Sequence, residues 1–219
     1  MRTLGLNVST ILSAAAIGVL GVSLATVPTV SAFHAPEPDP IPRRWQLDYK
    51  PGALRMAKFT KADGSSASYL YMTYRVTNKT GEDVLFAPSF ELADGQGGVF
   101  RSGRGVPLDV AAKIQKDLAN PFLEDQISIL GMLLQGDENA KDGLVIWPFD
   151  NLTASEITVY AAGFSGEVKM APSFVDPKTG QPVQTATYKT SMSRFKTGGD
   201  MTKRGTDAFE PYETTWIMR

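Results

Sequence analysis

Short runs in which apolar and polar side chains alternate are the feature that most constrains how this chain folds. In the run YLYMTYRV, residues 69–76, one face carries Leu70, Met72, Tyr74 and Val76. The other face carries Tyr69, Tyr71, Thr73 and Arg75. Successive side chains of a β-strand point to opposite faces of a sheet, so the run predicts a strand whose first set lies in a core. A slip of one residue would turn that whole set toward solvent, and the pattern therefore fixes the register.

Two reversals are predicted around the next strands. The first lies at 78–81, NKTG, where Asn and Gly tolerate the positive φ of a tight turn. We expect residues 83–86 to return from it as an antiparallel hairpin with the first strand. The second lies in the glycine-rich segment 94–98, between short apolar runs at 90–92 and 99–101.

The spacing of the apolar residues changes once, in the segment 107–119. Val110, Ile114 and Leu118 follow one another at a spacing of four, with polar residues on the remaining faces. This spacing predicts an amphipathic helix. Three aliphatic residues and an alanine are what a helix needs to cover a sheet, so we expect it to pack on its own domain.

Two segments after the helix are apolar without a simple period. Residues 122–135 fit either a helix or short buried strands, and we favour strand after Gln126. Residues 144–147, LVIW, are apolar on both faces, which predicts a strand covered on each side, with the inserted helix as one possible cover. Alternating strands are also predicted near 157–161, after a reversal at 176–182, and at the carboxyl end.

Many short strands, one inserted helix and no alternation of strands with helices favour an all-β, antiparallel sandwich. Trp45, Trp147 and Trp216 are far apart in the sequence. We expect them to meet in or near the core, because tryptophan buries a large apolar area.

The amino-terminal segment predicts export. Residues 1–32 carry Arg2 as their only charge and end in Val30-Ser31-Ala32, after which we expect signal peptidase to cut. An uncleaved membrane anchor is the alternative, since about 20 apolar residues can cross a bilayer. With cleavage the chain keeps no stable membrane span and is periplasmic or extracellular.

Residues 33–44 follow as a proline-rich leader. Pro36, Pro38, Pro40 and Pro42 alternate with other residues. This spacing opposes helix and favours extended backbone, so we expect an exposed leader ahead of a single β-sandwich domain over 45–219.

Composition excludes several classes of protein. The net charge of the whole chain is −1, so no basic footprint for nucleic acid is present. The chain has no cysteine, which excludes disulfides, thiol chemistry and a lipoprotein anchor. We expect no cofactor. The single histidine, His34, lies in the leader, which argues against the catalytic and zinc sites that depend on histidine.

A resemblance to a known class of domain covers residues 69–166. The matching segments are YMTYRVTNKTGEDVLF at 71–86, Asp94-Gly95, LQGDE at 134–138, GLVIW at 143–147 and Ile157-Thr158-Val159. With these segments the sequence resembles the immunoglobulin-like β-sandwich modules of the telokin-like type found in bacterial secreted proteins and lipoproteins. That resemblance implies a binding or structural role outside the cytoplasm. It implies no catalytic residue.

Acidic residues give two weaker interpretations. A glycan hydrolase needs two carboxylates held across a sugar. The candidates for that role are Glu124, Asp125, Asp137, Glu138 and Asp142. Asp137, Asn139 and Asp142 could supply oxygen ligands to calcium, but the full ligand spacing of an EF-hand is missing, which favours a polar turn without an ion.

The best surface candidates are Tyr69, Tyr71 and Arg75, on the outer face of the strand at 69–76. Aromatic side chains on a sheet can stack on sugars or anchor a protein partner, and they can equally lie under the inserted helix. The sequence therefore leads to a non-enzymatic, exported module that binds a protein or polysaccharide at the cell envelope. A carboxylate-based glycan hydrolase is the alternative.

Overall fold

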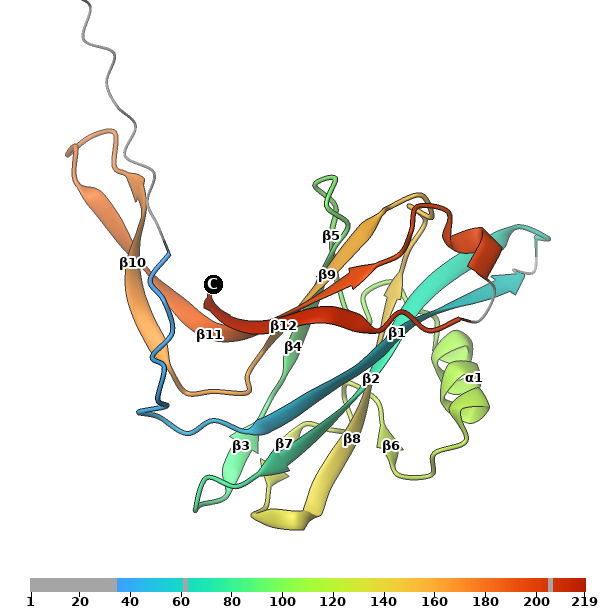
Figure 1. The fold of residues 1–219 in the computed structure, drawn as a ribbon, viewed down its shortest axis with the longest axis horizontal. Helices are drawn as coiled ribbons and strands as arrows, with labels where there is room; N and C mark the ends of the chain where they lie inside the picture. Colours follow the sequence, from blue (N-terminus) through green and yellow to red (C-terminus); the bar gives the residue numbers. More distant parts are fainter. Residues whose placement is uncertain (1–34, 61–62, 205–206) are drawn as a thin grey trace, which may run out of the picture. The chain divides into compact units, whose positions relative to one another are not determined.

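The structure, a computed structural model, describes residues 35–60, 63–204 and 207–219 (Figure 1). It is an all-β sandwich with one inserted helix, as the alternation predicts. One sheet has the strand order β1 (Asp48–Thr60), β2 (Ser66–Asn78), β8 (Gly136–Pro148) and β6 (Leu123–Glu124). The other has the order β10 (Val168–Val175), β11 (Pro182–Lys196), β9 (Glu156–Ala162), β4 (Ser89–Ala93) and β5 (Val99–Arg101), with β12 (Pro211–Met218) also paired to β11. The strands of both sheets pair antiparallel except β6, which runs parallel to β8.

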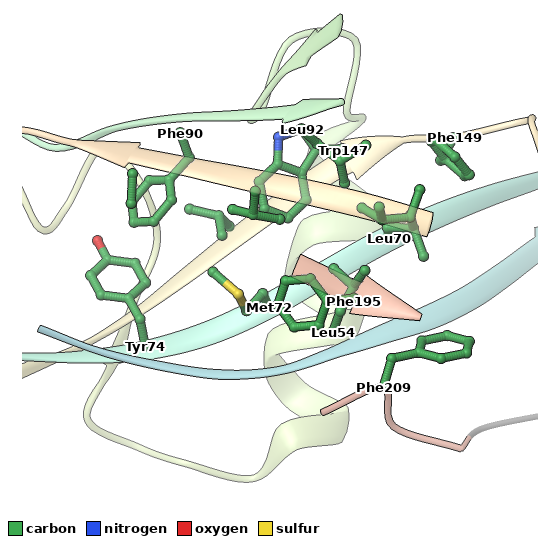
Figure 2. Packing of buried hydrophobic residues seen from close by; sticks show 14 of the residues in the cluster. Leu54, Leu70, Met72, Tyr74, Phe90, Leu92, Trp147, Phe149, Phe195 and Phe209 are labelled. Atoms are coloured by element: carbon green, nitrogen blue, oxygen red, sulfur yellow. The ribbon is translucent and has the colours of Figure 1, made fainter. Parts of the chain in front are cut away.

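A single apolar cluster fills the space between the two sheets (Figure 2). Leu70 and Met72 from β2 are fully buried there, which confirms the predicted core face. They meet side chains of the second sheet, among them Phe90, Leu92, Ile157 and Phe195. Trp147 is fully buried in the cluster, and Trp45 and Trp216 pack against it partly buried, so the three tryptophans do converge on the core.

Helix α1 (Leu108–Leu118) covers the outer face of the first sheet and confirms the helix predicted there. Val110 and Ile114 pack on Leu144 and Ile146 of β8 in a second apolar cluster. Strand β8 is therefore buried on both faces, as its unbroken apolar run predicts. The helix ends at Ala119, whose φ of 53° is left-handed and terminates the regular turn.

The predicted hairpin of residues 83–86 with the preceding strand is wrong. The turn itself is present, with Gly81 at a φ of 98°. However, β3 (Val84–Phe86) pairs with β7 (Gly131–Leu133), because β1 and β8 already occupy both edges of β2. The buried amide of Asn78 donates to the carbonyl oxygens of Glu82 and Leu133 and so joins the turn to β7.

The segment 122–135 is mostly neither of the two predicted structures. Residues 126–129 form a turn, in which the Asp125 carboxylate accepts the backbone N–H groups of Ile127 and Ser128. Strand returns only at 131–133. A short side chain that accepts two nearby N–H groups competes with both helix and sheet. The reversals at 94–98 and 176–181 are confirmed as the β4–β5 and β10–β11 hairpins.

Strand β11 is long enough to leave the sandwich. Its second half pairs with β9 and β12, whereas its first half pairs only with β10. Residues 168–188 therefore form a two-stranded arm, which Figure 1 shows extending from the rest of the sheet.

The leader is only partly the exposed segment that was predicted. Residues 40–44 are exposed, but the backbone N–H of Asp39 donates to Glu167 at the base of the arm over 2.7 Å. Glu167 is itself buried and accepts the buried Lys189 ammonium at 2.9 Å. Residues 36, 38 and 39 are only partly exposed, because Glu167 and Lys169 at the base of the arm hold this part of the leader, so the expectation of full exposure is wrong there.

Trp147→Ala should lower the free energy of unfolding by about 3 to 5 kcal/mol, because it empties a large, fully buried site. Chemical denaturation measures the change. The matched control is Ile127→Ala, whose side chain is 71% exposed and should cost less than about 0.5 kcal/mol. Equal stability of the two variants would contradict the core assignment.

Gly143→Ala should destabilise the protein by about 1 to 3 kcal/mol, although alanine ordinarily suits a strand better than glycine. The reason is local: Gly143 lies opposite Tyr74, and an added Cβ would overlap its ring. The same substitution made in a Tyr74→Leu background should cost clearly less. A double-mutant cycle by thermal denaturation tests this coupling, and purely additive effects would refute it.

Stability in acid should depend on Glu167. Burial raises the pKa of this carboxyl, but hydrogen bonds from the Asp39 N–H, Lys189 and Lys169, together with the charge of Lys189, outweigh burial and hold the pKa below its ordinary value of 4.5. A lowered pKa stabilises the fold above pH 4.5 and loses that contribution as the pH falls further. Glu167→Gln should therefore be destabilised at pH 7 and approach wild type as the pH falls well below 4.5. Glu210→Gln, at an exposed position, should follow wild type throughout.

Candidate functional site

A polar cleft of about 650 Å³ opens on the outer face of the first sheet, beside the end of helix α1. Its charged and aromatic lining consists of Lys50, Arg55, Tyr71, Tyr74, Arg75, Asp117 and Asp142. The strand register explains this gathering. Arg55 of β1 lies opposite Tyr71 of β2, and Arg75 lies opposite Lys50 on one side and Asp142 of β8 on the other. Every second side chain of a strand points to the same face of the sheet, and paired residues of neighbouring strands share that face. These side chains therefore form one continuous polar surface.

Arg75 and Asp142 form the ion pair of the cleft. The Arg75 Nη1 lies 2.9 Å from Asp142 Oδ1, and the Asn120 amide donates to the other carboxylate oxygen at 3.3 Å. The Arg75 side chain is 51% exposed. Pairs this exposed contribute about 0 to 1 kcal/mol, so a ligand can exchange with either partner at small cost.

Arg55 is the unpaired cation of the cleft. Its side chain is partly buried, and it forms no ion pair or hydrogen bond within the part of the chain that the structure describes. A partly desolvated guanidinium presents a fork of N–H donors that matches a carboxylate or phosphate. The cleft therefore contains a donor group without an acceptor.

Tyr71 supplies the aromatic surface beside Arg55. Burial raises the pKa of its hydroxyl; the charge of Arg55 opposes this shift and that of Asp117 adds to it. The hydroxyl thus stays protonated at neutral pH and can donate a hydrogen bond. A half-buried ring with a polar tip is suited to stack on a sugar or a planar group.

The sequence-predicted surface is only partly assembled. Tyr71 and Arg75 line the cleft, but Tyr69 is buried under helix α1, with its ring 5.7 Å from that of Phe59. Tyr69 lies on the outer side of the sheet, as predicted, but helix α1 covers it, which is the alternative to an exposed surface residue. Sequence reasoning missed Arg55. The only sign of it in the sequence is a single cation between two apolar residues, Leu54 and Met56, which are both buried.

The carboxylates considered for glycan hydrolysis are largely engaged elsewhere. Glu124 pairs with Lys141 at 3.1 Å. Burial raises the pKa of Asp125, but the N–H groups of its own turn outweigh it and hold the pKa below the ordinary value. The hydrogen bond and charge of Lys79 likewise hold the pKa of Asp137 low. A general acid needs a raised pKa, so Asp125 and Asp137 are unsuited to that role.

The three possible calcium ligands also have separate partners. Asp137 pairs with Lys79 at 2.9 Å, Asp142 pairs with Arg75, and the Asn139 amide donates to the Gln135 carbonyl. Among the described residues, no three histidine, cysteine or acidic side chains gather in a way that could hold a metal ion. His34 lies outside the described residues.

Comparison of the chain with protein-family models, curated proteins and solved structures finds no match. No helix within the ranges that the structure covers is long and apolar enough to cross a membrane. The fold and the cleft are thus the observations from which function is argued.

Proposed function

We propose that this protein is a non-enzymatic, exported module that binds an acidic polysaccharide of the cell envelope in the cleft between Arg55 and Asp142. The observation that carries the proposal is that Arg55, partly buried and without an ion-pair partner among the described residues, lies opposite Tyr71 in the strand register and lines the same cleft. An aromatic ring beside a free cation suits a sugar that carries a carboxylate.

The remaining lining supports the same ligand class. Lys50 and Arg75 add two cations, and Asp117 and Asp142 add two anions, so the lining has an excess of positive charge although the whole chain is at −1. Carboxylate oxygens and the Asn120 amide suit the hydroxyl groups of a sugar. The apolar segment at 1–32 supports export, to the periplasm or the cell exterior, and placement at the envelope.

We also propose a specific type of sandwich for this chain. The turn and strand pattern over 69–166 favours the immunoglobulin-like, telokin-like type of sandwich, a type that implies binding without catalysis. Of the carboxylates considered for the hydrolase alternative, Glu124, Asp125, Asp137 and Asp142 are each held by other groups of the chain.

The test is binding of the purified chain to soluble polyuronate and to neutral dextran, measured by calorimetry. We expect binding to polyuronate only. Arg55→Ala should weaken it by about tenfold or more, since a hydrogen bond to a charged group contributes about 1.5 to 3 kcal/mol. Tyr71→Ala should weaken it several-fold.

Two matched controls lie away from the cleft. Arg104→Ala removes an exposed arginine beside β5, and Tyr212→Ala removes a tyrosine that is 46% exposed. Both should bind polyuronate as wild type does. If Arg55→Ala binds polyuronate with unchanged affinity, the cleft is not the binding site. If the chain instead binds a protein partner, and Arg55→Ala abolishes that binding, the ligand is not a polysaccharide.

A further inference from the structure

The leader is held at the base of the arm by a specific set of polar contacts. Lys169 donates to the carbonyl oxygen of Glu37 at 2.6 Å and to the carboxylate of Asp39 at 2.7 Å. Lys189 donates to the carbonyl oxygen of Asp39 at 3.3 Å, and Glu167 accepts the Asp39 N–H at 2.7 Å. Three side chains at the base of the arm thus contact both the main chain and one acidic side chain of the leader.

These side chains form a preorganised binding site. The side chains of Glu167 and Lys189 are only 6% and 4% exposed, and they pair with each other at 2.9 Å. Buried charges are costly unless they are paired and hydrogen-bonded, so this pair has a fixed geometry. Lys169 lies at the rim, between Glu167 and Asp39, at 3.4 Å and 2.7 Å.

A groove of about 740 Å³ accompanies the polar contacts. Its walls are leader residues 35–40 with Pro42, together with Gln46, Lys189 and the β12 residues from Thr215 to Met218. The ring of Trp216 lies in this wall, with the Lys189 ammonium 5.9 Å from its centroid. An aromatic wall beside a proline-spaced, extended segment is a known mode of peptide recognition.

The leader is joined to the domain by an exposed linker. Residues 40–44 have no regular secondary structure, and Ile41 is 77% exposed. Residues 37–39 therefore bind to the domain as a short peptide would, although the linker attaches them covalently. A segment attached in this way competes with an identical segment supplied by another molecule.

We propose that the base of the arm is a peptide-binding site for an acidic, proline-spaced segment, and that the leader occupies it in the resting chain. The recognised features are an extended backbone with proline on both sides of an aspartate, as in Glu37-Pro38-Asp39-Pro40. The external segment is the leader of a second copy of this chain, which carries the same Glu37-Pro38-Asp39-Pro40 sequence. This site is independent of the polysaccharide cleft.

The experiment uses the whole chain and a labelled peptide of sequence APEPDPIP, which copies residues 35–42. Asp39→Pro removes from the leader both the N–H that Glu167 accepts and the carboxylate that Lys169 contacts. Fluorescence anisotropy should show that the peptide binds this variant at least tenfold more tightly than wild type. Glu37→Pro is the matched control, because it keeps the carbonyl oxygen that Lys169 uses, and it should bind the peptide as weakly as wild type does.

Specificity is tested in the Asp39→Pro background. Adding Lys169→Ala should abolish peptide binding, whereas Lys169→Arg should retain it, and unfolding curves establish that each variant is folded. A peptide with asparagine in place of aspartate should bind at least fivefold more weakly. Equal affinity of the two peptides, or no binding to the Asp39→Pro variant, would overturn the proposal.

Sedimentation velocity then distinguishes the source of the segment. A dimer of the wild-type chain that dissociates in excess peptide supports the site with the leader of a second copy as its ligand. A wild-type chain that stays monomeric at every concentration, although the Asp39→Pro variant binds the peptide, would overturn the second copy as the ligand. A dimer that excess peptide leaves intact, although the peptide saturates the Asp39→Pro variant, would overturn leader exchange between copies.

Discussion

Burial of both faces of β8 is the constraint on which the rest of the structure depends. Val145 and Trp147 point into the space between the sheets, while Leu144 and Ile146 lie under helix α1. A strand that is apolar on both faces needs a cover on each, so the helix is fixed over the first sheet. The cleft lies just beyond the end of that helix, where the outer face of β1, β2 and β8 becomes polar.

Much of the fold follows from local patterns, but strand pairing does not. Alternation identifies the buried face of β2, and spacing identifies helix α1, because both depend on residues close in the sequence. The partner of β3 depends on which edges are free: β2 is paired on both sides, and β7 lies almost fifty residues further along the chain. No local pattern contains that information.

The same distinction explains the candidate site. Alternation correctly places Tyr69 and Tyr71 on the outer side of β2, but it cannot say which of them the helix covers. Arg55 was missed because a single cation in an alternating strand is usually a solvated residue. Its importance appears only when β2 places Tyr71 opposite it and no described acidic group pairs with it.

The two proposed sites use ion pairs of opposite character. Arg75 and Asp142 are partly exposed, so exchanging one partner for a ligand costs little and the cleft can adapt to a flexible polysaccharide. Glu167 and Lys189 are buried, so neither can be left unpaired cheaply, and the geometry that they present to the leader is fixed before any peptide arrives. Preorganisation of this kind lowers the cost of ordering a ligand, which is how a site with few contacts can select one short segment.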